Sequence, residues 1–298
     1  MYSTWPYVYG YSLIKRKGWG EFLVDILEEI EFNEDVFDHL VVPKNALLDN
    51  QDIDLSFNRK ELIKALVLNK EKQQVQDIVS GKGGGLIFLL HGPPGVGKTL
   101  TAEATAEILH KPLYTVSVGE LGCTPVDVEE SLSKILEIAE IWDAVILLDE
   151  ADIFLEARTT ENITRNAIVG IFLRLLEYHN GIIFLTTNRI NNFDCAIMNR
   201  ISMTFFYEDL ELETRKKVWK NLFEAFKIDD SNIDIYKLAE YRINGRQIKN
   251  TIRLSQCLAA SRGELVNQNH LHFILNQDRN DYSFGSNEHD YSKKPNNK

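Results

Sequence analysis

Cysteine is scarce in this sequence, with only Cys123, Cys195 and Cys257 among 298 residues. The three are widely spaced and form no CxxC pair, so neither a disulfide framework nor a zinc site is indicated. We therefore expect three reduced thiols that are buried in the folded chain.

Long apolar runs and an excess of basic residues are also lacking. The best apolar run, Leu86–Leu90, is far shorter than the roughly 18 residues that a membrane span requires, so we expect no membrane span. Lys and Arg number 33 against 44 Asp and Glu, which gives a formal net charge of −11. Because phosphate binding needs clustered cations, this balance argues against a sequence-independent grip on DNA or RNA. We expect no nucleic-acid partner.

Acidic residues are missing before Glu21, whereas Lys15, Arg16 and Lys17 are basic. This asymmetry is the one feature that suggests a mitochondrial presequence. A presequence is rich in Arg and Ser and has an amphipathic helical period, but this stretch is aromatic and contains turn-forming residues. We predict an intracellular, cytoplasmic protein and keep a mitochondrial location as the alternative.

The chain separates by composition and pattern into four predicted segments, 1–58, 59–208, 209–278 and 279–298. The first contains a predicted helical segment, Glu21–Ile30, and a polar, acidic loop at 44–58. The last is rich in Asn, Asp, Ser and Lys and has few apolar residues, so we expect it to be disordered.

Short apolar runs alternate with helical patterns across 59–208. The expected strands are Leu86–Leu90, Pro112–Val118, Val145–Leu148, Ile182–Thr186 and Ile201–Tyr207. This alternation predicts an α/β fold with a five-stranded, mostly parallel sheet and helices on both faces. In 209–278 the strand signal disappears, and apolar residues such as Val218 and Leu222 recur at helical spacing, which predicts a small all-helical subdomain.

A glycine-rich segment follows the first of these strands directly and fits the P-loop pattern G-x-x-x-x-G-K-[ST]. Glycines let backbone N–H groups curl around phosphates, Lys98 reaches the β- and γ-phosphates, and the Thr99 hydroxyl provides a magnesium ligand. The alternative is a glycine-rich turn before an ordinary helix, Leu100–Leu109, but such a turn would not require Lys98 and Thr99. The predicted ATP-binding residues are Gly92, Pro93, Pro94, Gly95, Val96, Gly97, Lys98, Thr99, Leu100 and Asp149.

Two carboxylates, Asp149 and Glu150, end the apolar run Val145–Leu148. In open α/β sheets, ligands sit outside the carboxyl ends of the strands. Asp149 can therefore hold Mg²⁺ together with Thr99, and Glu150 can orient and deprotonate an attacking water. The alternative is that these acids cap a helix.

Asn188 follows the predicted strand Ile182–Thr186 and adds a polar side chain at the same edge of the sheet. It can position the water between Glu150 and the γ-phosphate. The alternative is an asparagine that only opens a turn.

These motifs resemble those of the AAA+ ATPases over roughly Phe57–Asn276. HGPPGVGKT at His91–Thr99 is similar to Walker A, ILLDEAD at Ile146–Asp152 to Walker B, and TTNR at Thr186–Arg189 to the sensor-1 strand. The resemblance implies a P-loop NTPase fold with a helical lid subdomain. Runs such as GYSLIKRKGWGEF resemble a group common in fungi, in which a large N-terminal region precedes the core. That likeness implies that most of this region is missing here.

The resemblance also implies roles for arginines. Arg200 lies in a segment similar to the one that ends in the arginine finger, and Met203 stands where the family has a second arginine. Arg246 looks like the sensor-2 residue, with an arginine in the solvated first turn of a helix as the alternative. Arg158 and Arg165 fall where the fungal group has basic residues near the subunit boundary, with salt-bridged surface arginines as the alternative.

The implied function is Mg²⁺-dependent ATP hydrolysis by a homo-oligomer, a hexamer by family resemblance, that remodels an unidentified protein partner. The loop Gly119–Val126 lacks the aromatic residue with which AAA unfoldases grip a polypeptide, and Leu121 is its weak substitute. The chain has no downstream NKxD, as a GTPase would, and no LSGGQ, as an ABC transporter would. The alternatives are a nucleotide-dependent binding module with little turnover and a truncated core without an independent role.

Overall fold

The structure is a computed structural model that describes residues 6–13, 18–41, 59–70, 84–158, 162–190 and 193–282. The chain divides into two compact units, Met1–Asp209 and Leu210–Lys298. The predicted acidic loop at 44–58 and residues 283–298 of the predicted disordered segment lie outside the described residues.

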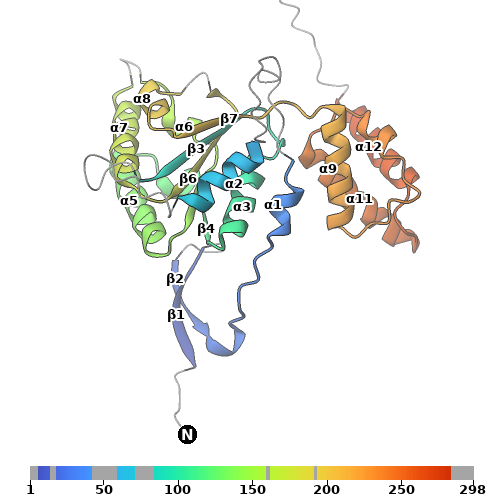
Figure 1. The fold of residues 1–298 in the computed structure, drawn as a ribbon, viewed down its shortest axis with the longest axis horizontal. Coiled ribbons are helices and arrows are strands. Elements are labelled where there is room, and N and C mark those ends of the chain that lie inside the picture. Colours follow the sequence, from blue (N-terminus) through green and yellow to red (C-terminus); the bar gives the residue numbers. More distant parts are fainter. Residues whose placement is uncertain are drawn as a thin grey trace, which may run out of the picture. The chain divides into compact units, whose positions relative to one another are not determined.

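Five parallel strands form the central sheet of the first unit (Figure 1). They are β3 (Leu86–His91), β4 (Leu113–Val116), β5 (Val145–Leu148), β6 (Ile182–Thr187) and β7 (Met203–Phe206), in the spatial order β4-β5-β6-β3-β7. Every pairing between neighbours is parallel. Strands of such a sheet are covered on both faces and therefore consist of near-continuous apolar residues, which is why the sequence pattern located all five. The predicted parallel α/β sheet is confirmed.

Helices cover both faces of this sheet (Figure 1). On one face lie α5 (Pro125–Ile141) and α7 (Ile163–Tyr178), and on the other lie α2 (Arg59–Asn69) and α3 (Lys98–Leu109). The remaining helices of the unit are short: α1 (Asp35–His39), α4 (Val118–Leu121), α6 (Asp152–Leu155) and α8 (Cys195–Met198). The sheet is therefore the middle layer of three.

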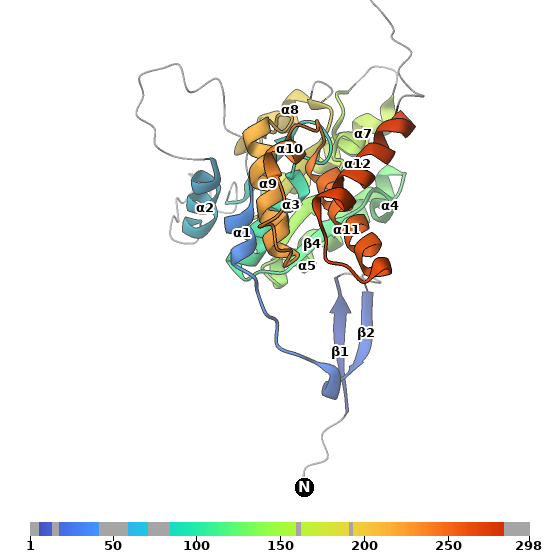
Figure 2. The same ribbon diagram turned by 90° about the vertical axis from the view of Figure 1, so that its right-hand side faces the viewer.

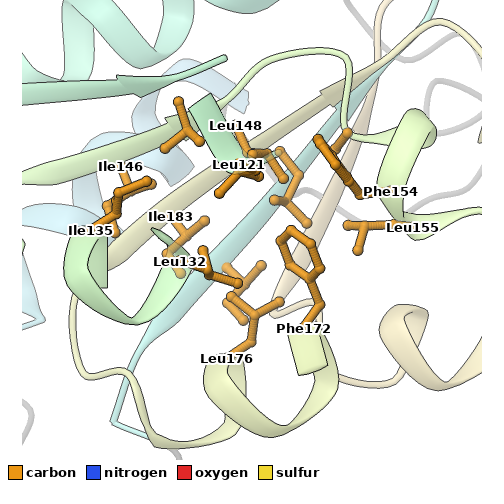
Figure 3. Packing of buried hydrophobic residues seen from close by; sticks show 14 of the residues in the cluster. Leu121, Leu132, Ile135, Ile146, Leu148, Phe154, Leu155, Phe172, Leu176 and Ile183 are labelled. Atoms are coloured by element: carbon orange, nitrogen blue, oxygen red, sulfur yellow. The ribbon is translucent and has the colours of Figure 1, made fainter. Parts of the chain in front are cut away.

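Alternation of side chains along the strands divides the core of this unit in two. Ile183 of β6 belongs to the cluster with α5 and α7, whereas the next residue, Phe184, belongs to the cluster with α2 and α3. Figure 3 shows the first cluster, in which Leu132 of α5 and Phe172 of α7 gather around Ile183. Each fully buried side chain of this size contributes about 1.5–3 kcal/mol to folding, so the two clusters stabilise the packing of the helices on both faces of the sheet.

An antiparallel hairpin of β1 (Tyr7–Ser12) and β2 (Gly18–Leu23) precedes the sheet in the sequence (Figure 2). A 3-10 turn at Val24–Ile26 follows it. The helix predicted at Glu21–Ile30 is therefore wrong, because its first residues belong to β2 and no helix follows the turn. Aromatic residues favour strands, and the cross-strand pairs outweigh the local helical spacing.

The second unit is helical throughout the residues that the structure describes. Its helices are α9 (Leu212–Ala225), α10 (Ile235–Ala239), α11 (Gly245–Arg262) and α12 (Gln268–Tyr282). They pack around a core that includes Trp219, Phe223 and Leu271, all fully buried. The predicted helical subdomain is confirmed, but α12 continues through Arg279, where disorder was predicted to begin.

The three cysteines are free, and all three are exposed, so the expectation of buried thiols is wrong. Cys123 lies in the turn between α4 and α5, and Cys257 lies on the outer side of α11. Among the described residues, no group of three or more His, Cys, Asp or Glu is placed to hold a metal ion. Within the same residues, none of the helices has the length and apolar character needed to cross a membrane.

Candidate active site

The glycine-rich loop runs from the end of β3 to the start of α3 and turns sharply at its glycines. Gly92 has φ +140°, and a Cβ added there would lie 2.0 Å from the Tyr207 carbonyl oxygen, so only glycine fits. Gly97 has φ +105° and is the N-cap of α3. The loop therefore ends at the N-terminus of α3, where backbone N–H groups are available and the helix dipole favours anions.

Lys98 is the first residue of α3, and its side chain is only 8% exposed. The ammonium group donates hydrogen bonds to the carbonyl oxygens of Gly92 at 2.7 Å and Pro93 at 2.6 Å, and to Asn188 Oδ1 at 2.9 Å. A buried charge is costly unless it is paired or hydrogen-bonded, and these three oxygens meet that need. The charge therefore sits inside the loop, next to the end of β6.

The other predicted loop residues differ in what they expose. Val96 is buried in the α3 side of the core, so only its backbone can face a ligand. Leu100 is 44% exposed, and Pro94 is exposed as well. Their predicted contacts with ATP remain predictions.

Asp149 directly follows β5 and meets Thr99 of α3. The Thr99 hydroxyl lies 3.5 Å from Asp149 Oδ1, and the Thr186 hydroxyl donates to the same oxygen. Two oxygen ligands at about 2.1 Å from one Mg²⁺ lie at most about 4.2 Å apart. The spacing and the hard oxygen donors of Thr99 and Asp149 therefore fit Mg²⁺.

Glu150 is exposed and has φ +55°, a left-handed conformation that costs a residue other than glycine about 1–2 kcal/mol. Its backbone N–H donates to Thr186 Oγ1 at 3.1 Å. The helix that follows, α6, has Ala151 as its N-cap and no side-chain cap. The alternative that these carboxylates cap a helix is therefore not what the structure contains.

Asn188 follows β6 and accepts the hydrogen bond from Lys98. The turn after β6 is instead closed by Thr187, whose hydroxyl donates to Asp152 at 2.8 Å and accepts from the Arg189 N–H at 2.8 Å. Asn188 thus contacts the glycine-rich loop, and another residue supplies the turn-forming contacts.

Beside these residues lies a cleft of about 600 Å³, lined by His91, Gly92, Pro93, Asn188, Arg189, Ile190 and Phe206. The His91 ring stacks on Phe206 with ring centroids 5.0 Å apart. Burial lowers the pKa of His91, and the charges of Lys98 and Arg59 lower it further. The imidazole is therefore neutral at pH 7 and adds no positive charge to the cleft.

Arg200 is held by its own chain, away from the glycine-rich loop. Its guanidinium donates to Glu177 at 3.1 Å and to the Ala196 carbonyl at 3.2 Å. It precedes β7, which starts at Met203 opposite Phe88, whereas the loop follows the far end of β3. Within the described residues, its buried Nε has no hydrogen-bond partner.

Arg158 and Arg165 form ion pairs inside the first unit. Arg158 Nε lies 2.8 Å from Asp194 Oδ2, and Arg165 lies 2.5 Å from Glu156. Burial raises the pKa of Asp194, but hydrogen bonds from Arg158 and the Ala196 N–H outweigh it and leave the pKa below its usual range. Both arginines match the salt-bridged alternative.

Arg246 occupies the first turn of α11 in the second unit. This helix begins with a capping box, in which the side chains of Asn244 and Gln247 each accept a hydrogen bond from the other's backbone N–H at 2.9 Å. The Arg246 side chain is exposed. Its predicted role as sensor 2 remains a prediction.

The segment Gly119–Val126 has an apolar residue at Leu121, but that side chain is fully buried in the core. Leu121 therefore cannot grip a polypeptide, which corrects the expectation that it substitutes for an aromatic residue. The exposed apolar side chain of the segment is Val126, at 65% exposure.

Comparison with known proteins identifies a family model that matches part of the chain. Residues 88–209 match a family model described as ATPase family associated with various cellular activities (AAA). This range includes the glycine-rich loop, both carboxylates, Asn188 and Arg200, but not Arg246.

Similar proteins are longer than this chain. The protein named ATPase family AAA domain-containing protein 3B of Homo sapiens is 30% identical over 216 residues, 66% of this chain and 33% of that protein. The protein named ATPase family AAA domain-containing protein 3 of Bos taurus is 32% identical over 146 residues, 46% of this chain and 25% of that protein. The outer mitochondrial transmembrane helix translocase of Homo sapiens is 25% identical over 235 residues, 70% of this chain and 61% of that protein.

Proposed function

Because this chain belongs to the AAA family of ATPases, we propose that it binds Mg²⁺-ATP and hydrolyses it at the carboxyl edge of the central sheet. The observation that carries the proposal is a pair of contacts at this edge. Lys98 meets Asn188 at 2.9 Å, and Thr99 meets Asp149 at 3.5 Å, although the partners are 90 and 50 positions apart in the sequence. Three motifs with the residue types of phosphoryl transfer thus converge on one place.

In this proposal the glycine-rich loop and Lys98 hold the β- and γ-phosphates. The Lys98 ammonium donates to oxygens of Gly92, Pro93 and Asn188, so ATP binding requires the lysine to exchange some of these oxygens for phosphate oxygens. Thr99 and Asp149 would hold Mg²⁺, which supplies positive charge against the phosphates when it is bound.

Glu150 and Asn188 act on the water. The Asn188 amide would position the water in line with the γ-phosphate, and the Glu150 carboxylate would accept its proton as the water oxygen attacks phosphorus, while the bond from phosphorus to the β–γ bridging oxygen breaks and ADP leaves. The exposed carboxylate of Glu150 gives water access to this base.

We propose further that the protein works as a homo-oligomer, with a hexamer as the family expectation. Arg200 supports this, because it lies before β7 and bonds α7, on the side of the sheet away from its own glycine-rich loop. It would serve as the arginine finger of a neighbouring subunit. Arg246, exposed in the first turn of α11, would sense the γ-phosphate.

The proposed client is a protein, in line with the printed name of the transmembrane helix translocase to which the chain is similar. Because Gly119–Val126 offers no aromatic grip and Leu121 is buried, we expect weak or no processive unfolding of a generic substrate. An intracellular location is proposed, cytoplasmic by sequence. The relative's name supports the mitochondrial alternative, and cell fractionation distinguishes the two.

A turnover assay separates this ATPase from the alternative of a nucleotide-dependent switch with little turnover. Purified protein should release phosphate from ATP only with Mg²⁺. In Lys98→Ala the loss of contacts to phosphate should lower ATP affinity at least about tenfold by calorimetry. The exposed Lys134→Ala is the matched control. ATP affinity as high in Lys98→Ala as in wild type would contradict the glycine-rich loop as the phosphate site.

A further inference from the structure

Thr186 lies beside the turn that carries both functional carboxylates. In the parallel register of β5 and β6, Leu148 pairs with Leu185. The next residues, Asp149 just beyond the end of β5 and Thr186 still within β6, therefore lie side by side. Thr186 is only 1% exposed, so water does not compete for its hydroxyl.

The Thr186 hydroxyl joins the two carboxylate residues. It donates to Asp149 Oδ1 and accepts from the Glu150 N–H at 3.1 Å. A hydroxyl has one hydrogen to donate and can accept as well, so both roles are filled at once. The Thr186 carbonyl also accepts from the Ala151 N–H at 2.8 Å, but any residue at position 186 supplies that bond.

We propose that Thr186 is a positioning residue that sets the orientation of Asp149 and holds the turn at Glu150. The inference rests on the proposed ATPase function. Glu150 adopts a left-handed conformation that is unfavourable for its residue type, and its N–H bond to Thr186 restrains it there. Thr99 approaches the same Asp149 oxygen, so the Thr186 bond also fixes the face that the carboxylate turns toward Mg²⁺.

Thr186→Val tests the hydroxyl, because valine keeps the shape and the strand propensity but loses both hydrogen bonds. Thr186→Ser keeps the hydroxyl and loses only a methyl group. Thr251→Val is the matched control, since Thr251 is equally buried and its hydroxyl donates at 2.9 Å to its own helix, at the Gln247 carbonyl. Thermal unfolding reports whether each variant folds.

The first readout does not need turnover. ATP affinity is measured by calorimetry in EDTA and in Mg²⁺. In EDTA, Thr186→Val should bind ATP as tightly as wild type. The factor by which Mg²⁺ raises ATP affinity should be about tenfold smaller in the variant, which is the loss typical of one hydrogen bond to a charged group. The turnover number should also fall about tenfold or more, whereas Thr186→Ser should keep most of both properties.

Two results would overturn the proposal. One is a folded Thr186→Val protein with the Mg²⁺ gain and turnover of wild type, and the other is a Thr186→Ser protein as impaired as the valine variant. If Thr186→Val does not fold, Thr186→Ser and Thr186→Cys, a weak donor, decide the question by their order of Mg²⁺ gain. A wild-type protein that binds Mg²⁺-ATP but never turns it over would contradict the ATPase proposal and leave the affinity test of Thr186 valid.

Discussion

The two ends of β6 use polar residues in opposite ways. At the carboxyl end, Thr186, Thr187 and Asn188 each bond a side chain from another segment. At the amino end, His179 is 6% exposed, and within the described residues its Nε2 has no hydrogen-bond partner. A Cβ on Gly181 would lie 2.2 Å from that nitrogen, so the packing there is tight. The carboxyl end of β6 therefore carries polar contacts that a ligand can replace, whereas the amino end is tightly packed.

This contrast predicts how substitutions divide. At the carboxyl end, the hydrogen bonds link residues that a ligand would also contact, so changes there should alter binding and turnover more than folding. At the amino end, changes should alter stability and leave the chemistry intact. Each prediction below tests one side of that division.

Arg200 is expected to give the largest effect, and it is an exception to the division. It bonds Glu177 near the amino end of β6, yet Arg200→Ala should lower turnover about 10³-fold or more, the typical contribution of an arginine finger supplied in trans. ATP affinity and thermal stability should change little. Phosphate release measures turnover, and calorimetry measures ATP affinity on the same protein. Thermal unfolding measures its stability.

A mixing experiment identifies where Arg200 acts. Glu150→Gln has an intact finger and no base, whereas Arg200→Ala has the base and no finger. Mixed in comparable amounts, the two inactive variants should regain part of the activity at interfaces that combine both intact residues. If light scattering shows co-assembly without any recovery, Arg200 is not a finger in trans, and Arg158 or Arg165 becomes the next candidate.

His179 should make the stability of the fold depend on pH between about 6.5 and 4. Burial lowers its pKa to about 4, and the charge of Lys70 adds to the effect. Between pH 6.5 and 4 the unfolded chain binds a proton that the folded chain does not, so the free energy of unfolding should fall by about 3 kcal/mol as the pH drops through this window.

The measurement for His179 is urea unfolding at several pH values, with His179→Phe as the comparison. The variant should lack this part of the pH dependence, and its turnover at pH 7 should equal that of wild type. Parallel pH profiles for the two proteins would mean that His179 is not the responsible group.

Two glycines give a smaller and sharper test: Gly85 directly precedes β3, and Gly97 is the N-cap of α3. A Cβ on Gly85 would lie 2.3 Å from the His179 carbonyl oxygen, so Gly85→Ala should destabilise by roughly 1–3 kcal/mol without changing ATP affinity. A Cβ on Gly97 meets nothing within 4 Å, but φ +105° is unfavourable for alanine, so Gly97→Ala should weaken ATP binding.

Gly170→Ala serves as the control, because Gly170 is exposed in α7 with nothing within 4 Å of a Cβ. It should stabilise by about 0.5–1 kcal/mol and leave ATP binding unchanged. Equal losses of ATP affinity in Gly85→Ala and Gly97→Ala would contradict the proposed distinction between the amino and carboxyl ends of the strands.

The sequence was sufficient for those parts of the site that are contiguous. Gly92–Thr99 and the five apolar strands are local patterns, and the parallel order of strands then brings Asp149 and Asn188 to one edge. Thr186 and Thr187 were missed as functional candidates, because their bonds depend on the β5–β6 register and on side-chain direction. A polar pair inside a buried strand is the signal that could have found them.

Other features that the sequence mispredicted or left open also depend on tertiary structure. The segment at Glu21–Ile30 has helical spacing, but its beginning pairs with β1, and pairing decided the conformation. The sequence suggested a finger at Arg200 but could not show that Glu177 binds it. Leu121 looked available for grip because nothing local indicates that α4 buries it.

The most direct test of the proposed chemistry is Glu150→Gln, which keeps the shape and hydrogen-bonding capacity of the side chain and removes the base. Glu150 is exposed, so the substitution should leave thermal unfolding unchanged. ATP should bind with wild-type affinity by calorimetry, and turnover should fall by about 10²-fold or more. Near-normal turnover in a variant that binds ATP normally would contradict the assignment of the base to this edge of the sheet.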